Sequence, residues 1–208
     1  MNFFSLGALG FLVGLTGAML PGPMSAYAIA SVLQGRFRNV ISIVLGHILI
    51  EAAMVALILL GLKPFLASET VFNSVSIVGA AALIAIGLRI IFTAKRLKLS
   101  TNKDSIFASR LILGGAFFTA FNPTFPIWWI SIGASLISRA LLLGLLGVIV
   151  LLAGHWLADL AWFSFVGLAV HKGKFYLDDR RYQLMLKILA LVLIGLGIWF
   201  IWQVCQSQ

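Results

Sequence analysis

Charged residues are scarce in this chain of 208 residues: Asp, Glu, Lys and Arg together make up 10% of it, and only six residues are acidic. Hydrophobic residues make up 62%, and the mean hydropathy is +1.10. Soluble domains typically contain about 25% charged residues, so this composition excludes a soluble globular protein and indicates an integral membrane protein. The length leaves no room for a separate soluble domain, and we expect a single transmembrane domain over residues 1–208.

Cysteine and the common catalytic motifs are nearly absent as well. Cys205 is the only cysteine, which excludes an internal disulfide and a cysteine metal cluster. The chain has no P-loop, no Rossmann glycine pattern and no HExxH zinc motif, so ATP hydrolysis and dinucleotide chemistry are not expected. We therefore predict a protein that is not an enzyme and that has no cofactor.

Six apolar segments are present, and each is long enough to cross a bilayer, for which about 20 residues suffice. The first segment is interrupted by Pro21-Gly22-Pro23, and the fourth by Asn122-Pro123 and again by Pro126. Proline removes a backbone N–H and breaks a helix, so the sequence predicts an all-α polytopic protein with broken first and fourth helices. The predicted segments cover residues 3–34, 40–62, 71–94, 106–137, 140–170 and 184–203.

The basic residues are distributed unevenly over the connections. Of the 15 Lys and Arg residues, 13 lie near the connections that follow segments one, three and five, and only Lys63 and Arg139 lie on the opposite side. We interpret the net charge of +9 as topology-setting loop charge rather than as a nucleic-acid surface. The positive-inside rule predicts a multi-pass plasma-membrane protein with loops 1–2, 3–4 and 5–6 in the cytoplasm and both termini outside.

The two halves of the chain share a pattern. Each half begins with a proline-broken helix and continues with a helix that contains Gly-His-x-x-x-acid. Three helices per repeat require the halves to be inverted in the membrane, so we predict inverted repeats over about residues 1–94 and 106–208, with a site where they meet. The two motif copies are Gly46-His47 with Glu51 and Gly154-His155 with Asp159.

Two acids and two histidines of this motif are the main candidates for binding. Glu51 and Asp159 are the only acids inside predicted spans, and a carboxylate at bilayer depth costs about 2.5–3.5 kcal/mol. Each follows a histidine, His47 or His155, by four residues, so each pair shares one helix face. The set suits a proton relay or a substrate ammonium group, and it also suits a transition-metal ion. Structural hydrogen bonds between helices are the simpler alternative.

The helix breaks are the second group of candidates. Helix ends at a break offer N–H groups to a carboxylate and carbonyl groups to a cation, and Asn122 adds a side-chain amide. A kink that serves only packing is the alternative. Trp128 and Trp129 could wall a cavity, although aromatic residues at helical spacing are more often packing residues. The break residues that we expect to line the site are Pro21, Gly22, Pro23 and Pro123.

The chain resembles the lysine-exporter (LysE/RhtB-type) superfamily of amino-acid exporters. The residues that carry the resemblance are Leu20-Pro21-Gly22-Pro23, Asn122-Pro123 and Asp159, together with the number of segments and the basic third connection. The resemblance implies a secondary transporter that exports amino acids or related small solutes and is driven by protons. Its partners would be the lipid bilayer, a small-molecule substrate and protons, with no nucleic acid, and a homodimer is compatible with it.

The Gly-His-x-x-x-acid repeat departs from the pattern of the typical amino-acid exporters, so the resemblance leaves the cargo open. The wider superfamily is also associated with divalent-metal exporters. The alternative cargo is therefore a divalent metal ion held by His47, Glu51, His155 and Asp159. An alternative from another class is a membrane enzyme or accessory protein that transports nothing.

Overall fold

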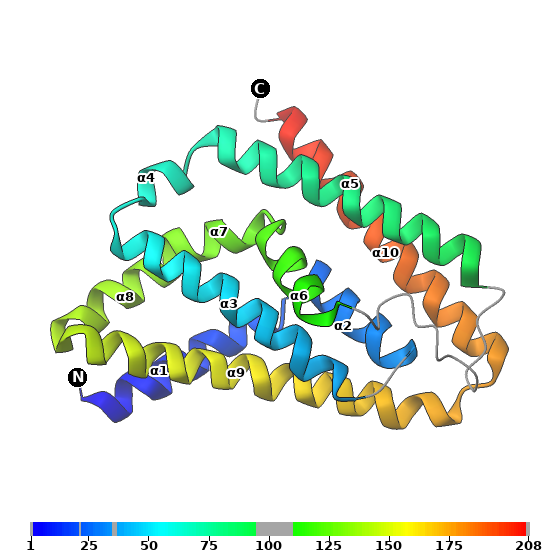
Figure 1. Cartoon of the computed structure of the whole chain (residues 1–208), viewed down its shortest axis with the longest axis horizontal. Helices are drawn as coiled ribbons and strands as arrows, with labels where there is room; N and C mark the ends of the chain where they lie inside the picture. The colour runs from blue at the N-terminus through cyan, green and yellow to red at the C-terminus, as the bar shows by residue number, and fades with distance from the viewer. Residues whose placement is uncertain (1, 21, 35–36, 95–109, 207–208) are drawn as a thin grey trace.

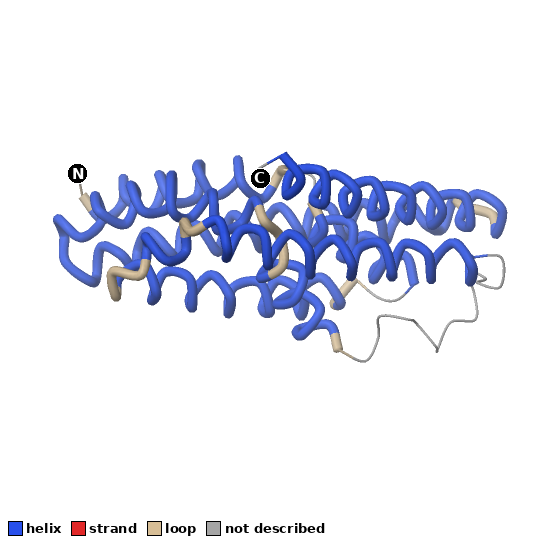
Figure 2. Tube along the Cα trace, turned by 90° about the horizontal axis from the view of Figure 1, so that it is seen from above, coloured by secondary structure: helices blue, strands red, loops and turns tan. Residues whose placement is uncertain are grey.

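The computed structural model describes residues 2–20, 22–34, 37–94 and 110–206, and within these ranges the chain is helical and contains no strand. Figure 1 shows the course of the helices, several of which cross one another at an angle, and Figure 2 shows that the bundle they form is flat. The helices are α1 (Phe3–Ala18), α2 (Pro23–Gln34), α3 (Asn39–Leu59), α4 (Lys63–Leu66), α5 (Glu69–Ala94), α6 (Leu111–Ala120), α7 (Thr124–Trp128), α8 (Ala134–Ala140), α9 (Gly144–Gly173) and α10 (Asp179–Gln206). Three short turns complete them, the π-helical η1 (Trp129–Gly133) and the 3₁₀ turns η2 (Leu141–Leu143) and η3 (Lys174–Tyr176).

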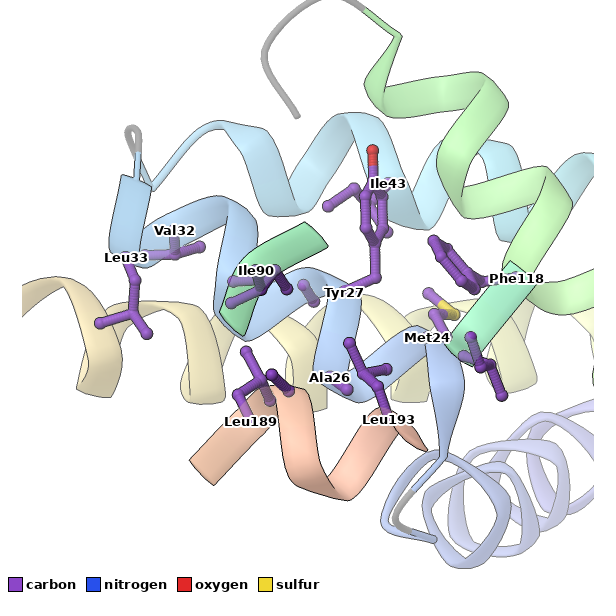
Figure 3. Close-up of a cluster of buried hydrophobic side chains, with 14 of the residues drawn as sticks. Met24, Ala26, Tyr27, Val32, Leu33, Ile43, Ile90, Phe118, Leu189 and Leu193 are labelled. Carbon is purple, nitrogen blue, oxygen red and sulfur yellow. The ribbon is translucent and has the colours of Figure 1, made fainter. Parts of the chain in front are cut away.

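The break in the first predicted segment is present. Helix α1 ends at Ala18, α2 begins at Pro23, and the two are bent by 78° relative to each other. Pro23 starts α2, where the missing N–H is not needed, and Pro21 lies outside the described residues. Almost all of α2 is buried. Figure 3 shows Tyr27 and Val32 of α2 among side chains from α5, α6 and α10.

The break in the fourth segment lies at Asn122-Pro123, as predicted, because α6 ends at Ala120 and α7 begins at Thr124. The predicted second interruption at Pro126 is wrong. Pro126 lies within the first turn of α7, where a backbone N–H would have no helical partner in any case, so proline is tolerated there. The helix instead changes to a π-helical turn three residues later, at η1.

The lengths of the helices agree with a membrane protein. Among the described residues, four helical stretches are long and apolar enough to span a bilayer, and the bent pair α1–α2 makes a fifth if it is counted as one span. One of these stretches, Thr124–Gly173, contains a turn: Gly144 has a φ of +71°, a left-handed conformation that glycine adopts without strain. Figure 1 shows that the chain reverses direction at this turn, so that α8 and α9 extend from it side by side and antiparallel. Large apolar side chains such as Leu49, Phe92 and Leu142 are exposed on the outside, as expected for a surface in contact with lipid.

The long helices pack in pairs that each join one half of the chain to the other. Helix α1 packs along α9, α3 along α6, and α5 along α10. Glycines make the first two contacts close: a Cβ on Gly46 of α3 would meet the Ile112 carbonyl of α6, and one on Gly154 of α9 would meet the Gly7 carbonyl of α1. Small residues let membrane helices approach closely, so each broken helix lies directly against the Gly-His-x-x-x-acid helix of the other half.

The C-terminal end of α2 is held by hydrogen bonds from two side chains. Carbonyl groups of the last helical turn lack helical partners and need other donors. Asn39 Nδ2 donates to the Ser31 carbonyl at 2.9 Å, and Lys174 Nζ donates to the Val32 carbonyl at 3.1 Å. These bonds allow a short helix with a buried surface to end inside the bundle.

Candidate functional site

Four predicted side chains meet at the centre of the bundle. His47 and Glu51 lie on α3, and His155 and Asp159 lie on α9, which packs against α3. Each pair is one helical turn apart and therefore shares a face. All four are nearly enclosed, with side-chain exposures between 2% for Asp159 and 13% for His47. The two motif copies are thus brought together from opposite halves of the chain.

Glu51 is the centre of this cluster. Its Oε1 lies 3.2 Å from His47 Nε2 and 3.0 Å from His155 Nε2. Trp129, at the start of the π-helical turn, donates its Nε1–H to the same oxygen at 3.3 Å. The contacts of Asp159 are longer: its Oδ2 lies 3.8 Å from His47 Nε2 and 3.7 Å from His155 Nε2.

The orientation of His47 is fixed by Thr119 on α6. The Thr119 hydroxyl donates to the Gly115 carbonyl one turn earlier at 2.8 Å, so toward His47 its oxygen accepts. His47 Nδ1–H is therefore the donor in the 2.8 Å contact with Thr119 Oγ1. In a neutral ring the lone pair of Nε2 then faces Glu51, and a positive centre between the two atoms is needed to make that contact favourable.

His155 is held by aromatic rings and by a glycine. Its ring centroid lies 5.2 Å from the rings of both Trp128 and Trp129. On its other side, a Cβ on Gly14 of α1 would lie 2.8 Å from His155 Nδ1. The ring therefore sits between α1 and the start of the π-helical turn, with Nε2 directed at Glu51.

A cavity of about 130 Å³ connects this cluster to both helix breaks. Two break residues line it together, Gly22 and Asn122, and Asn122 Nδ2 lies 3.7 Å from the position of a Cβ on Gly22. Asn122 Oδ1 accepts from the backbone N–H and the hydroxyl of Thr124, at 3.2 and 2.9 Å, and so ties the break to the first residue of α7. The wall also includes Trp128, Trp129, Phe125, Ser25, His47, Glu51, His155 and Asp159.

The sequence profile of the LysE type translocator family matches residues 15–204. The chain belongs to this family. Members are membrane transporters of small solutes rather than enzymes, so the chain is a multi-pass membrane protein that acts on a small-molecule substrate. No curated protein and no solved structure matches the chain.

In this translocator, the predicted site residues separate into two groups. His47, Glu51, His155 and Asp159 contact one another, and Gly22 and Asn122 line the same cavity. Pro23 and Pro123 are buried beside the breaks and are not among the residues that line the cavity, and Pro21 lies outside the described residues. The prolines of the described breaks therefore shape the backbone around the cavity.

Two residues that contact the histidine–acid cluster of the translocator belong to no sequence motif. Thr119 was given no role from the sequence, and Trp129 was expected to be a wall or packing residue. Both contact the cluster through hydrogen bonds from α6 and η1. A polar residue opposite a histidine on another helix is visible only when the packing of the helices is known.

Thr119→Val is expected to lower transport about tenfold, the lower end of the effect of losing a group that orients a histidine. Valine has the same shape but cannot accept the His47 Nδ1–H, so the ring is free to turn its Nε2 away from Glu51. Thr119→Ser keeps the acceptor and should transport as the wild type does. The comparison is made by initial flux in proteoliposomes at equal protein density. Equal flux in the valine and serine variants would show that Thr119 does not position His47.

Proposed function

We propose that this chain is a secondary transporter that exports a small solute by alternating access, with its cargo site in the cavity between the two helix breaks. The observation that carries the proposal is the lining of this cavity, which includes both breaks and all four residues of the histidine–acid cluster. Broken helices whose ends face a central site are how many transporters bind cargo within the membrane. Ionisable residues at that depth are otherwise costly and rare.

The helix pairs support an inverted-repeat arrangement for this transporter. Exchanging the two halves, about residues 1–94 and 106–208, turns the α1–α9 pair into the α6–α3 pair and leaves the α5–α10 pair unchanged. We propose that the halves are related in this way, with loops 1–2, 3–4 and 5–6 in the cytoplasm. In such transporters one repeat rocks against the other around a fixed site.

The coupling that we propose is an exchange of cargo for protons at the histidine–acid cluster. Because Glu51 and Asp159 bring two carboxylates next to two imidazoles, the cluster is most stable when it holds positive charge. A cationic group of the cargo and protons would compete for the histidine–acid cluster. Protons would therefore leave the cluster when the cargo binds and return when it is released. An amino acid could place its ammonium group at the carboxylates and its carboxylate near the polar groups of Asn122 and the helix breaks.

Flux in proteoliposomes tests the proposal. We expect the purified chain to move at least one solute of a panel of amino acids and divalent metal ions faster than protein-free vesicles do. Reversing an imposed pH gradient should reverse the direction in which that solute accumulates. Transport of no solute under either gradient would contradict an exporter, and flux that ignores the gradient would contradict proton coupling.

A further inference from the structure

We propose that His47, Glu51, His155 and Asp159 form a binding site for one divalent transition-metal ion. Each residue directs one donor atom into the cluster: Nε2 from each histidine, Oε1 from Glu51 and Oδ2 from Asp159. The donor atoms of His47, Glu51 and Asp159 all lie within 4.8 Å of one another. His155 Nε2 is close to the two carboxylates, 3.0 Å from Glu51 Oε1 and 3.7 Å from Asp159 Oδ2, but it is not part of this mutually close set. The binding of an ion is inferred from the site itself. That the bound ion is the cargo rests on the export function proposed above.

The distances between the histidine nitrogens and the carboxylate oxygens are close to those between neighbouring ligands of one metal ion. Metal–nitrogen and metal–oxygen bonds of about 2.0–2.2 Å place neighbouring tetrahedral ligands about 3.3–3.6 Å apart. The four distances between a histidine Nε2 and a carboxylate oxygen are 3.0, 3.2, 3.7 and 3.8 Å. The two longer ones, both to Asp159, exceed the length of a hydrogen bond, yet they lie close to the spacing of two ligands of one ion.

Unused donor capacity also points to a ligand. Asp159 Oδ2 and Glu51 Oε2 are buried and have no hydrogen-bond partner among the described residues. Such atoms are costly in an apolar interior unless a cation or water satisfies them. The Nε2 lone pair of a neutral His47 faces Glu51 and has the same need, because the single N–H of the ring, at Nδ1, is donated to Thr119.

The surroundings have the properties of a metal centre. Ligating histidines usually donate their second N–H to a fixed acceptor, and ligating carboxylates are usually hydrogen-bonded in turn. Thr119 does the first for His47, and Trp129 does the second for Glu51. The cavity that reaches the helix breaks provides an entry path.

The donor set indicates the class of ion. Imidazole nitrogen suits Zn²⁺ and its first-row neighbours, whereas Mg²⁺ and Ca²⁺ prefer sites made only of oxygen. Two carboxylates balance the charge of one divalent ion, so the loaded site with neutral histidines is neutral overall. A neutral complex is favoured at a position where net charge is expensive.

Equilibrium binding of Zn²⁺ to the purified full-length chain in detergent, without a histidine tag, tests the site. We expect one Zn²⁺ per chain that excess Mg²⁺ does not displace. His155→Ala should weaken this binding at least about 10-fold, the lower end of the effect of losing even a group that only supports a ligand. His171→Ala, which removes the third histidine of the chain from outside the cluster, should leave it unchanged. No stoichiometric binding to the wild type, or equal binding in both variants, would overturn the proposal.

A wild-type measurement covers the case in which His155→Ala does not fold. Co²⁺ bound in the same place should absorb more intensely in the visible than aqueous Co²⁺ does, and one equivalent of Zn²⁺ should remove this absorption. Absorption no stronger than that of aqueous Co²⁺ would overturn the site.

Flux separates this inference from the export function. A chain that binds Zn²⁺ but moves no solute would refute export and leave the metal site intact. Amino-acid transport by a chain that binds no Zn²⁺ would do the opposite.

Discussion

Glu51→Gln is expected to lower cargo flux at least about 100-fold, the upper end of the effect of losing a group that only supports a ligand. Glutamine has nearly the same size, but it removes the charge from the oxygen that lies within 3.3 Å of His47, His155 and Trp129. The cluster then has one carboxylate for two imidazoles and no longer offers a favourable place for a cation. Initial flux in proteoliposomes measures the effect.

Glu69→Gln is the matched control for this experiment. Glu69 is exposed in the first turn of α5, so its replacement changes the chain's charge equally without changing the cluster. Asp159→Asn should resemble Glu51→Gln. If Glu51→Gln and Asp159→Asn both transport at the wild-type rate, the cluster is not the transport site.

Gly46→Ala is expected to lower the free energy of unfolding by about 3 kcal/mol, the upper end of the usual cost of overpacking. The added methyl group would meet the Ile112 carbonyl and the Ala116 nitrogen of α6, and neither backbone atom can turn aside. Helices α3 and α6 would have to separate, which moves His47 away from Thr119. Unfolding in mixed detergent and SDS micelles gives the change in free energy.

Gly195→Ala provides the comparison for Gly46→Ala. A Cβ at Gly195 of α10 has nothing within 4 Å, and alanine favours helix by about 1 kcal/mol over glycine. This variant should be as stable as the wild type or slightly more stable. Equal stability of Gly46→Ala and the wild type would contradict the close backbone contact between α3 and α6.

Much of the helical organisation follows from the sequence because it depends on local rules. The broken first and fourth helices follow from proline chemistry, and α3, α5, α9 and α10 begin and end within a few residues of the predicted segments. Pro126 shows that the rule depends on where the proline lies within the helix. A proline breaks a helix in its interior but not in its first turn. The topology in the membrane and the inverted repeat remain predictions.

The two half-sites can be predicted from local spacing, but their meeting can be predicted only from the repeat. The i,i+4 spacing places His47 beside Glu51 and His155 beside Asp159 without knowledge of the fold. Their meeting depends on the packing of α3 against α9, which the repeat suggests but does not fix. The contributions of Thr119 and Trp129 could not be predicted, because each depends on the rotation of a helix from a different part of the chain.

Access to the cavity from the two sides of the membrane is the most direct test of the account. Cys205 is the only cysteine and is exposed. Ser25→Cys in a Cys205→Ser background therefore places a single thiol in the cavity wall. The wild-type chain, whose single thiol is Cys205 outside the cavity, is the control. The account predicts that saturating cargo or a reversed pH gradient moves the reactivity of the Ser25→Cys thiol from one side of the vesicle membrane to the other, while Cys205 reacts from the same side throughout. Reactivity of the cavity thiol from both sides at once, or from one side under every condition, would contradict alternating access through this cavity.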